Sequence, residues 1–346
     1  MIGRGSQPRS GAVSSAETLL AGSGPETTTT AAPATGASGA GSGSDGPGLD
    51  RAPGSGGEPG PARPTRARRL GSRIVGWWLP EIPRSRVGIM RAVIYLFLIY
   101  DILYLRNDVI PHGYAPELYQ PLWIGRALPL PEPSVALAQT LQIVIIVGCL
   151  IAATGRLPRL AGWTVALCYF QWLILSMSFG KVDHDHLALI IAAFVLPTIG
   201  RARITDRGTT PGGGWAFRCI QIAVIATYFG AALAKWVRNG APFAWGSSAV
   251  LTWAFIRRGS ALARWSLDYP WILRLSQWIM LIAEYLSPVV LFLRGKALYL
   301  AAAFFLGFHA ITFITLGIHF LPTVVCWLAF FPTEKLLPRR FRPAPA

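Results

Sequence analysis

Long apolar runs alternate with short polar connections along most of the chain, from about residue 87 to residue 331. Several runs hold roughly 17 to 25 residues with few or no charges, the length of helix that crosses the hydrocarbon core of a bilayer. The pattern therefore predicts an all-α polytopic integral membrane protein with about eight transmembrane helices. The predicted spans cover approximately residues 87–105, 134–154, 160–179, 187–199, 215–236, 272–293, 297–315 and 318–331.

Two of these runs, residues 187–199 and 318–331, are shorter than the others. A short apolar helix fits a bilayer when it tilts against its neighbours, is partly re-entrant, or is extended by flanking polar residues. We expect one of these three arrangements for each of them.

The N-terminal part of the chain has a different composition. Residues 1–70 are mostly Gly, Ser, Ala, Pro and Thr, and such a segment buries too little apolar surface to offset the entropy of ordering. We predict a disordered cytoplasmic tail there, ending in the basic stretch ARPTRARRLGSR, which is expected to lie against anionic headgroups. Residues 71–335 then form the transmembrane domain, and residues 336–346 form a basic C-terminal tail.

The positions of Lys and Arg in the short connections predict the orientation, since cytoplasmic loops are enriched in these residues. The pattern places both termini in the cytoplasm together with three basic connections, which contain Arg156 and Arg159, then Arg201, Arg203 and Arg207, then Arg294 and Lys296. Residues 237–271 are an outer connection that also carries Arg, mixed with Trp, as is typical of a helix lying in the membrane interface.

Composition supports a membrane protein and narrows the partners. The chain is 52% hydrophobic and only 14% charged, yet its formal net charge is +16. Because the Arg residues flank the apolar runs instead of forming one basic patch, the charge indicates topology, and we predict a lipid membrane and no nucleic acid as partner. The Ala, Gly and Arg content is typical of a high-GC bacterium, so the predicted location is a bacterial plasma membrane.

The stretch SFGKVDHDHL, residues 178–187, places five titratable groups between two apolar runs. One interpretation is a loop hydrated at the membrane rim. A metal site is a second, but residues two apart lie about 200° apart on a helix, and no HExxH motif occurs, so we predict no metal. The third is a buried base, because on a helix Lys181 shares a face with His184 and Asp185, and a desolvated Lys accepts protons near neutral pH.

Further ionisable residues lie inside the predicted spans, among them Asp101, Lys235, Glu284 and His309. Each carries an insertion cost, so we expect them to face the bundle interior or a wet cavity. The alternative is that they pair with one another, for example Glu284 with Lys235, and hold helices together.

Three stretches, taken in order, resemble one known family. They are GKVDHDHL, TYFGAALAKWVRNGAPFAWG, and AEYLSPVVLF followed by LGFHAITFITLGIHFLPTVVCWLAFFP. Over about residues 85–335 the chain is similar to the vitamin K-dependent gamma-carboxylases and their bacterial relatives, the HTTM (horizontally transferred transmembrane) domain proteins.

The resemblance implies a multi-helix membrane domain that oxidises a reduced quinone and uses the product as a base. Lys181 matches the family Lys that deprotonates the quinol, and His186 matches the His after it, so these two are the predicted catalytic residues. The predicted cofactor-binding residues are Lys235, Glu284, His309 and His184, with menaquinol as the cofactor that a bacterial membrane suggests. The family's large extracytoplasmic portion is expected to be missing, and Val182, Asp183 and Asp185 replace the family's neighbours of the Lys.

Three functions remain open from the sequence. The first is quinol-dependent proton abstraction or carboxylation at the outer membrane face. The alternative is a non-catalytic accessory protein for a membrane partner, a secreted protein or an exported peptide. A small-molecule transporter is less favoured, because no inverted repeat or matching pair of Gly/Pro-broken helices is evident.

Overall fold

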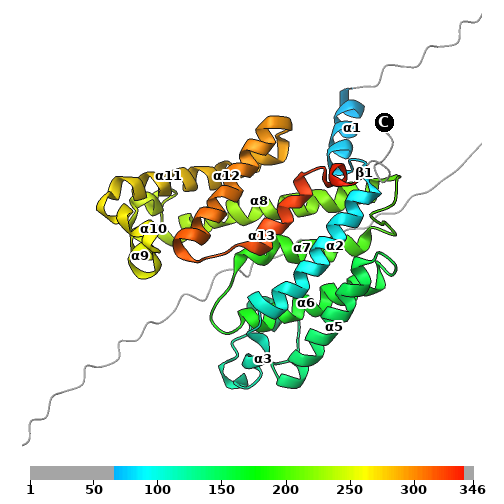
Figure 1. Cartoon of the computed structure of the whole chain (residues 1–346), viewed down its shortest axis with the longest axis horizontal. Helices are drawn as coiled ribbons and strands as arrows, with labels where there is room; N and C mark the ends of the chain where they lie inside the picture. Colours follow the sequence, from blue (N-terminus) through cyan, green and yellow to red (C-terminus); the bar gives the residue numbers. More distant parts are fainter. Residues whose placement is uncertain (1–65, 339–346) are drawn as a thin grey trace, which may run out of the picture. The chain divides into compact units, whose positions relative to one another are not determined.

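A computed structural model describes residues 66–338, and most of these residues are helical (Figure 1). The helices are α1 (Arg66–Trp78), α2 (Arg84–Tyr100), α3 (Val109–His112), α4 (Trp123–Ala127), α5 (Val135–Ala153), α6 (Leu160–Met177), α7 (Leu187–Val195), α8 (Pro211–Asn239), α9 (Ala249–Arg258), α10 (Ala261–Arg264), α11 (Pro270–Leu286), α12 (Gly295–Leu316) and α13 (Leu321–Cys326). Two short antiparallel strands, β1 (Ile82–Pro83) and β2 (Thr209–Thr210), pair Ile82 with Thr210.

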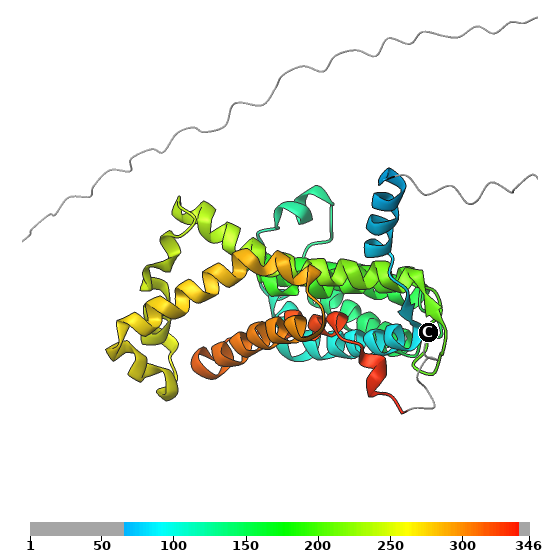
Figure 2. The ribbon, with the colours of Figure 1, turned by 90° about the horizontal axis from the view of Figure 1, so that it is seen from above.

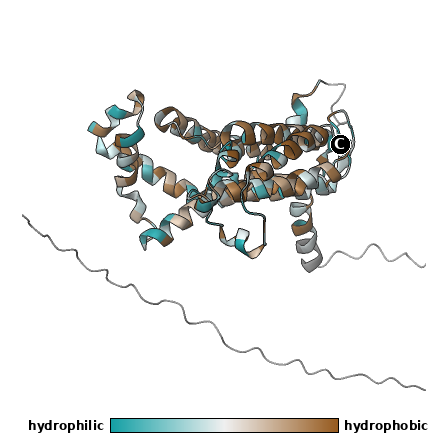
Figure 3. Ribbon diagram, turned by 90° about the horizontal axis from the view of Figure 1, so that it is seen from below, coloured by the Kyte–Doolittle hydropathy of each residue, from teal (hydrophilic) through white to brown (hydrophobic). Residues whose placement is uncertain are grey.

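Six helical segments in the described part are long and apolar enough to cross a membrane, which confirms an all-α, multi-pass membrane protein (Figure 3). They are Arg84–Leu105, Val135–Ala153, Leu160–Met177, Pro211–Asn239, Pro270–Phe292 and Gly295–Leu316. The predicted fourth and eighth spans correspond to the shorter apolar helices His184–Thr198 and Leu321–Phe330. The prediction that these two are short is therefore confirmed.

The predicted boundaries of the terminal segments need one correction. Most of the tail assigned to residues 1–70 lies outside the described residues, but Arg66 already belongs to α1, so the helix begins inside that segment. The tail assigned to residues 336–346 also lies mostly outside them, and Leu336 ends a short 3₁₀ helix, Thr333–Leu336.

Two packed groups of helices share the long helix α8. The larger core is built from α2, α5, α6, α7 and α8, and a smaller cluster of Phe255, Ala263 and Leu273 joins the segments around α9 to α12. The yellow segments α9, α10 and α11 gather at one end of α8, and the cyan and green α2, α5 and α6 lie at the other (Figures 1 and 2).

Close helix contacts in the larger core depend on small residues, as is typical of membrane proteins. A Cβ atom added at Gly162 of α6 would lie 2.7 Å from the Pro197 ring and 2.8 Å from the Tyr95 hydroxyl. Glycine is therefore the residue that lets α6 approach α2 and the end of α7.

A buried arginine explains how the short helix α7 ends inside the protein. The Arg91 guanidinium of α2 donates hydrogen bonds to the carbonyl oxygens of Leu196, Ile199, Gly200 and Ala202, at 2.8 to 3.2 Å. The last carbonyls of a helix have no partners of their own, and burying them unpaired is costly. Arg91 supplies both the donors and a positive charge at the negative end of the helix dipole.

An ion pair joins the start of the first span to the segment after the last apolar helix. Arg86 donates from Nε and Nη2 to the two carboxylate oxygens of Glu334, at 2.6 and 2.7 Å. Burial alone would raise the pKa of Glu334, but the hydrogen bonds and charge of Arg86 outweigh it and hold that pKa below its ordinary value.

The substitution Glu334→Gln tests this pair. We expect it to lower the free energy of unfolding by about 2 kcal/mol at about pH 7, because a bidentate charged hydrogen bond is lost. A pKa lowered by folding stabilises the protein fully above the ordinary value of 4.5 and progressively less as the pH falls through the folded-state pKa. Thermal unfolding in detergent should thus show a difference from wild type that shrinks in acid, whereas Glu117→Gln, at an exposed carboxyl, should match wild type throughout.

Candidate functional site

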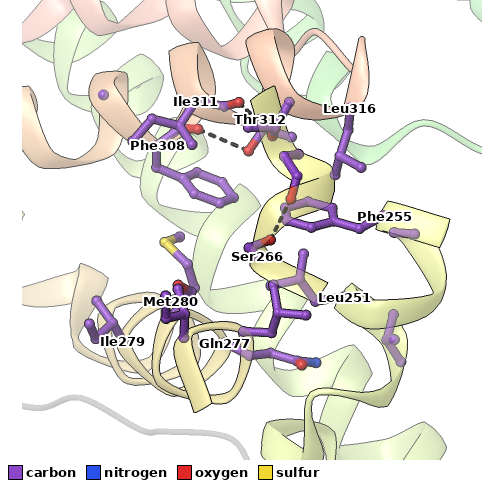
Figure 4. Close-up of a pocket in the computed structure, with 18 of the residues that line it drawn as sticks. Leu251, Phe255, Ser266, Gln277, Ile279, Met280, Phe308, Ile311, Thr312 and Leu316 are labelled. Carbon is purple, nitrogen blue, oxygen red and sulfur yellow. Dashed lines mark hydrogen bonds between the residues drawn. The ribbon is translucent and has the colours of Figure 1, made fainter. Parts of the chain in front are cut away.

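A large apolar cavity of about 760 Å³ lies between α8, α9, α11 and α12. Figure 4 shows Leu251, Phe255, Met280 and Phe308 among the side chains that surround it. Ligand pockets for small molecules are typically apolar cavities of about 300 to 1,000 Å³ with a few polar groups. The size and lining suit a lipid-soluble molecule.

An ion pair forms part of the wall of this cavity. Lys235 of α8 donates to both carboxylate oxygens of Glu284 of α11, and its ammonium lies 4.5 Å from the centre of the Trp245 ring. The Glu284 side chain is 8% exposed and that of Lys235 is 21% exposed. The predicted pairing of Glu284 with Lys235 is therefore confirmed, and the pair faces the cavity as well as joining two helices.

Gln277 of α11 also lines the apolar cavity, and this residue was not predicted from the sequence. Its Nε2 donates to the Trp245 carbonyl at 2.6 Å, but its buried Oε1 has no hydrogen-bond partner within residues 66–338. Leaving a buried acceptor unpaired costs about 1–3 kcal/mol. The free oxygen can therefore favour a ligand that brings a hydroxyl or amide donor. The available signal was a Gln inside a predicted membrane span.

A second, smaller cavity of about 210 Å³ is polar and contains the residues predicted from SFGKVDHDHL. Lys181 lines it, but the helix of this region begins only at His184, so Lys181, His184 and Asp185 do not share a helix face. Gly180, with φ at +96°, turns the chain before Lys181. The Lys181 side chain is 79% exposed and its Nζ lies 3.3 Å from Asp183. The expectation of a buried, desolvated Lys181 is wrong.

His186 is the centre of a buried charge cluster. Its Nδ1 lies 2.9 Å from Asp185 and its Nε2 lies 3.0 Å from Asp101, which also accepts a hydrogen bond of 2.7 Å from the Tyr169 hydroxyl. Each ring nitrogen faces a carboxylate, and both carboxylates are satisfied when the ring is the doubly protonated imidazolium. This cluster ties the end of the first span to α6 and to the start of the short helix that leads into α7.

Arginine 106 extends the same cluster toward the polar cavity. Its guanidinium forms an ion pair with Asp183, and its carbonyl accepts a hydrogen bond of 3.1 Å from the Trp172 indole. Asp101 was expected to face the bundle interior, and it is fully buried. Arg106 was not foreseen, because it follows the predicted first span directly and resembles a residue of the membrane rim.

The two remaining predicted residues lie apart from the apolar cavity. His184 lines the polar cavity, whereas His309 is buried and its Nε2 lies 2.7 Å from the Tyr228 hydroxyl. The Phe320 ring contacts both, with its centre 6.3 Å from that of His184 and 4.9 Å from that of His309. The predicted cofactor-binding set is thus divided between the apolar cavity, the polar cavity and an aromatic cluster.

The substitution Asp101→Asn tests the charge cluster. It removes one carboxylate from the imidazolium of His186, and breaking a buried ion pair from one side costs about 3–5 kcal/mol. Tyr169→Phe removes only a hydrogen bond to the same carboxylate and should cost about 1 kcal/mol. Unfolding in detergent should show a larger decrease in the free energy of unfolding for Asp101→Asn than for Tyr169→Phe. Equal decreases would contradict a charged His186.

No family model, curated protein or solved structure matches this chain. Within residues 66–338 there is also no group of three or more His, Cys, Asp or Glu side chains placed to bind a metal.

Proposed function

We propose that this protein binds a reduced quinone in the apolar cavity and abstracts a proton from a ring hydroxyl of that molecule. The observation that carries the proposal is the combination of a large apolar volume with a charged pair and an unpaired acceptor on its wall. A quinol needs these features, since it has an apolar body and two hydroxyl donors. The resemblance to the carboxylases and HTTM-domain proteins supports the same class of ligand.

Each polar group of the apolar cavity has a role in this proposal. The free Oε1 of Gln277 accepts a hydrogen bond from one ring hydroxyl and thereby orients the ring. The Glu284 carboxylate accepts the proton of the other ring hydroxyl. The Lys235 ammonium then stabilises the negative charge that remains on the ring oxygen. The electrostatic interaction of this ion pair with a bound ligand is strong, because apolar side chains surround the pair and little water screens its charges.

The proposal changes the roles predicted for Lys181 and His186. Lys181 lines the polar cavity and not the apolar one, and both ring nitrogens of His186 face carboxylates. We therefore assign the role of the base to Glu284, assisted by Lys235. His186 instead positions the end of the first span. Carboxylation as a later step rests on the resemblance alone.

We further propose eight spans in a bacterial plasma membrane, with both termini cytoplasmic and the polar cavity at the outer face. The support is the distribution of Lys and Arg in the connections and the eight apolar segments, six of which are long enough to span. The two short segments are held by packing, as the contacts of Arg91 with the end of α7 illustrate.

A non-catalytic accessory role is the second candidate. It is favoured by exposed aromatic side chains outside the spans, such as Tyr114 at 75% and Trp123 at 78% exposure, which suit contact with a partner protein or exported peptide. This role requires no ligand in the apolar cavity, so ligand binding separates the two candidates.

Binding of menaquinone to the purified protein in nanodiscs tests the proposed function. We expect saturable binding of the reduced form, weakened about tenfold by Gln277→Leu because one hydrogen bond is lost. Lys181→Ala should leave this binding unchanged, since Lys181 lines the other cavity. The absence of saturable binding to wild type would reject the quinol and leave the accessory role.

Cysteine labelling tests the proposed orientation. Val182 is 61% exposed beside the polar cavity. In a background without the four native cysteines, Val182→Cys should react with a membrane-impermeant maleimide in intact cells. Arg156→Cys, in a connection assigned to the cytoplasm, should react only after lysis. Labelling in the reverse order would overturn the orientation.

A further inference from the structure

The small polar cavity has more cationic than anionic side chains in its lining. Arg106, Lys181 and Arg258 line it, against two carboxylates, Asp183 and Asp185. His184, His186 and His319 add imidazole rings to the same wall. A cavity lined in this way favours an anion over a cation or a neutral molecule.

Both carboxylates of the cavity are already paired. Asp183 forms ion pairs with Arg106 and Lys181, and Asp185 lies 2.9 Å from the His186 ring. Arg258, by contrast, has no carboxylate within ion-pair distance in the described part of the chain. Its guanidinium, with up to five N–H donors, belongs to the lining of a cavity whose two carboxylates are both paired with other residues.

The polar cavity directly adjoins the apolar one along the chain. On α9, Phe255 lines the apolar cavity and Arg258, one helical turn later, lines the polar cavity. At the end of α12, Leu316 lines the first and Gly317 the second. The polar cavity thus lies where apolar helix surface ends, which is the depth of lipid phosphates in a bilayer.

Exposed tryptophans support the same depth. Trp253 of α9 is 63% exposed, and Trp265, in the turn after α10, is 55% exposed. Tryptophan is enriched at the level of the lipid headgroups, because its ring is apolar and its N–H is polar. The segment that carries Arg258 is therefore built to lie beside headgroups.

We propose that the polar cavity binds the phosphate group of an anionic lipid, with Arg258 and Lys181 as its charged donors and His319 as a further donor. The planar guanidinium matches two phosphate oxygens, and the flexible Lys181 supplies a point charge. A volume of about 210 Å³ holds one phosphate group with a few waters. This site is independent of the quinol, which occupies the other cavity.

Two neighbouring arginines provide a matched test. Arg258→Gln removes the proposed ligand, and Arg257→Gln removes the same charge from an exposed neighbour that lines neither cavity. Full-length protein is compared in nanodiscs of phosphatidylglycerol and of phosphatidylcholine, by thermal unfolding and by native mass spectrometry of retained lipid. We expect wild type and Arg257→Gln to be stabilised by phosphatidylglycerol and to retain it, and Arg258→Gln to bind it about tenfold more weakly.

A parallel titration of detergent-solubilised protein with inorganic phosphate, at constant ionic strength, distinguishes the source of the phosphate. Stabilisation by phosphatidylglycerol without an effect of inorganic phosphate supports a lipid headgroup. An Arg258-dependent effect of inorganic phosphate without lipid retention supports the phosphate site but assigns it to a soluble ligand. The proposal is overturned if neither ligand affects wild type, or if Arg257→Gln loses as much as Arg258→Gln. Unchanged menaquinol binding by Arg258→Gln would confirm that the two sites are independent.

Discussion

A charge inside an apolar helix bundle is stable only when another group pairs with it, and this constraint explains much of the architecture. Asp101 is fully buried and is held by His186 and Tyr169, while Glu284 is held by Lys235. Arg91 meets the same requirement with backbone carbonyls at the end of α7. Each pairing joins segments that are far apart in the sequence, so the charges fix how the apolar helices are placed.

The same pairings determine what each cavity can do. The Lys235–Glu284 pair connects α8 to α11, and the apolar cavity lies against it with α12 on another side. The His186 cluster connects the end of the first span to the segment before α7, and the polar cavity lies beside it. One charged pair therefore faces an apolar volume, whereas the other cluster faces a polar one. Acid–base chemistry is strengthened in the first setting, and anion binding suits the second.

The helices and some of the pairings could be predicted from the sequence, because hydrophobic length and the insertion cost of a charge are local properties. The eight apolar segments, the shortness of two of them and the contact between Lys235 and Glu284 follow from these properties. The surroundings of Lys181 could not be predicted, because the spacing of the polar residues is compatible with a helix through residues 181–185, whereas Gly180 turns the chain and the helix begins at His184. Gln277 was missed because its unpaired oxygen depends on the position of Trp245, thirty-two residues earlier.

The exposure of Lys181 has a chemical consequence for any reaction of this protein. A lysine becomes a base near neutral pH when its ammonium loses solvation, but an ammonium in water keeps its proton. The Lys181 side chain is 79% exposed, and its Nζ lies 3.3 Å from the Asp183 carboxylate. Glu284 and Lys235 are shielded by apolar side chains and face the larger cavity. The proposed proton abstraction is therefore assigned to Glu284 and Lys235 on α11 and α8, and the exposed Lys181 is assigned to the proposed anion site in the polar cavity.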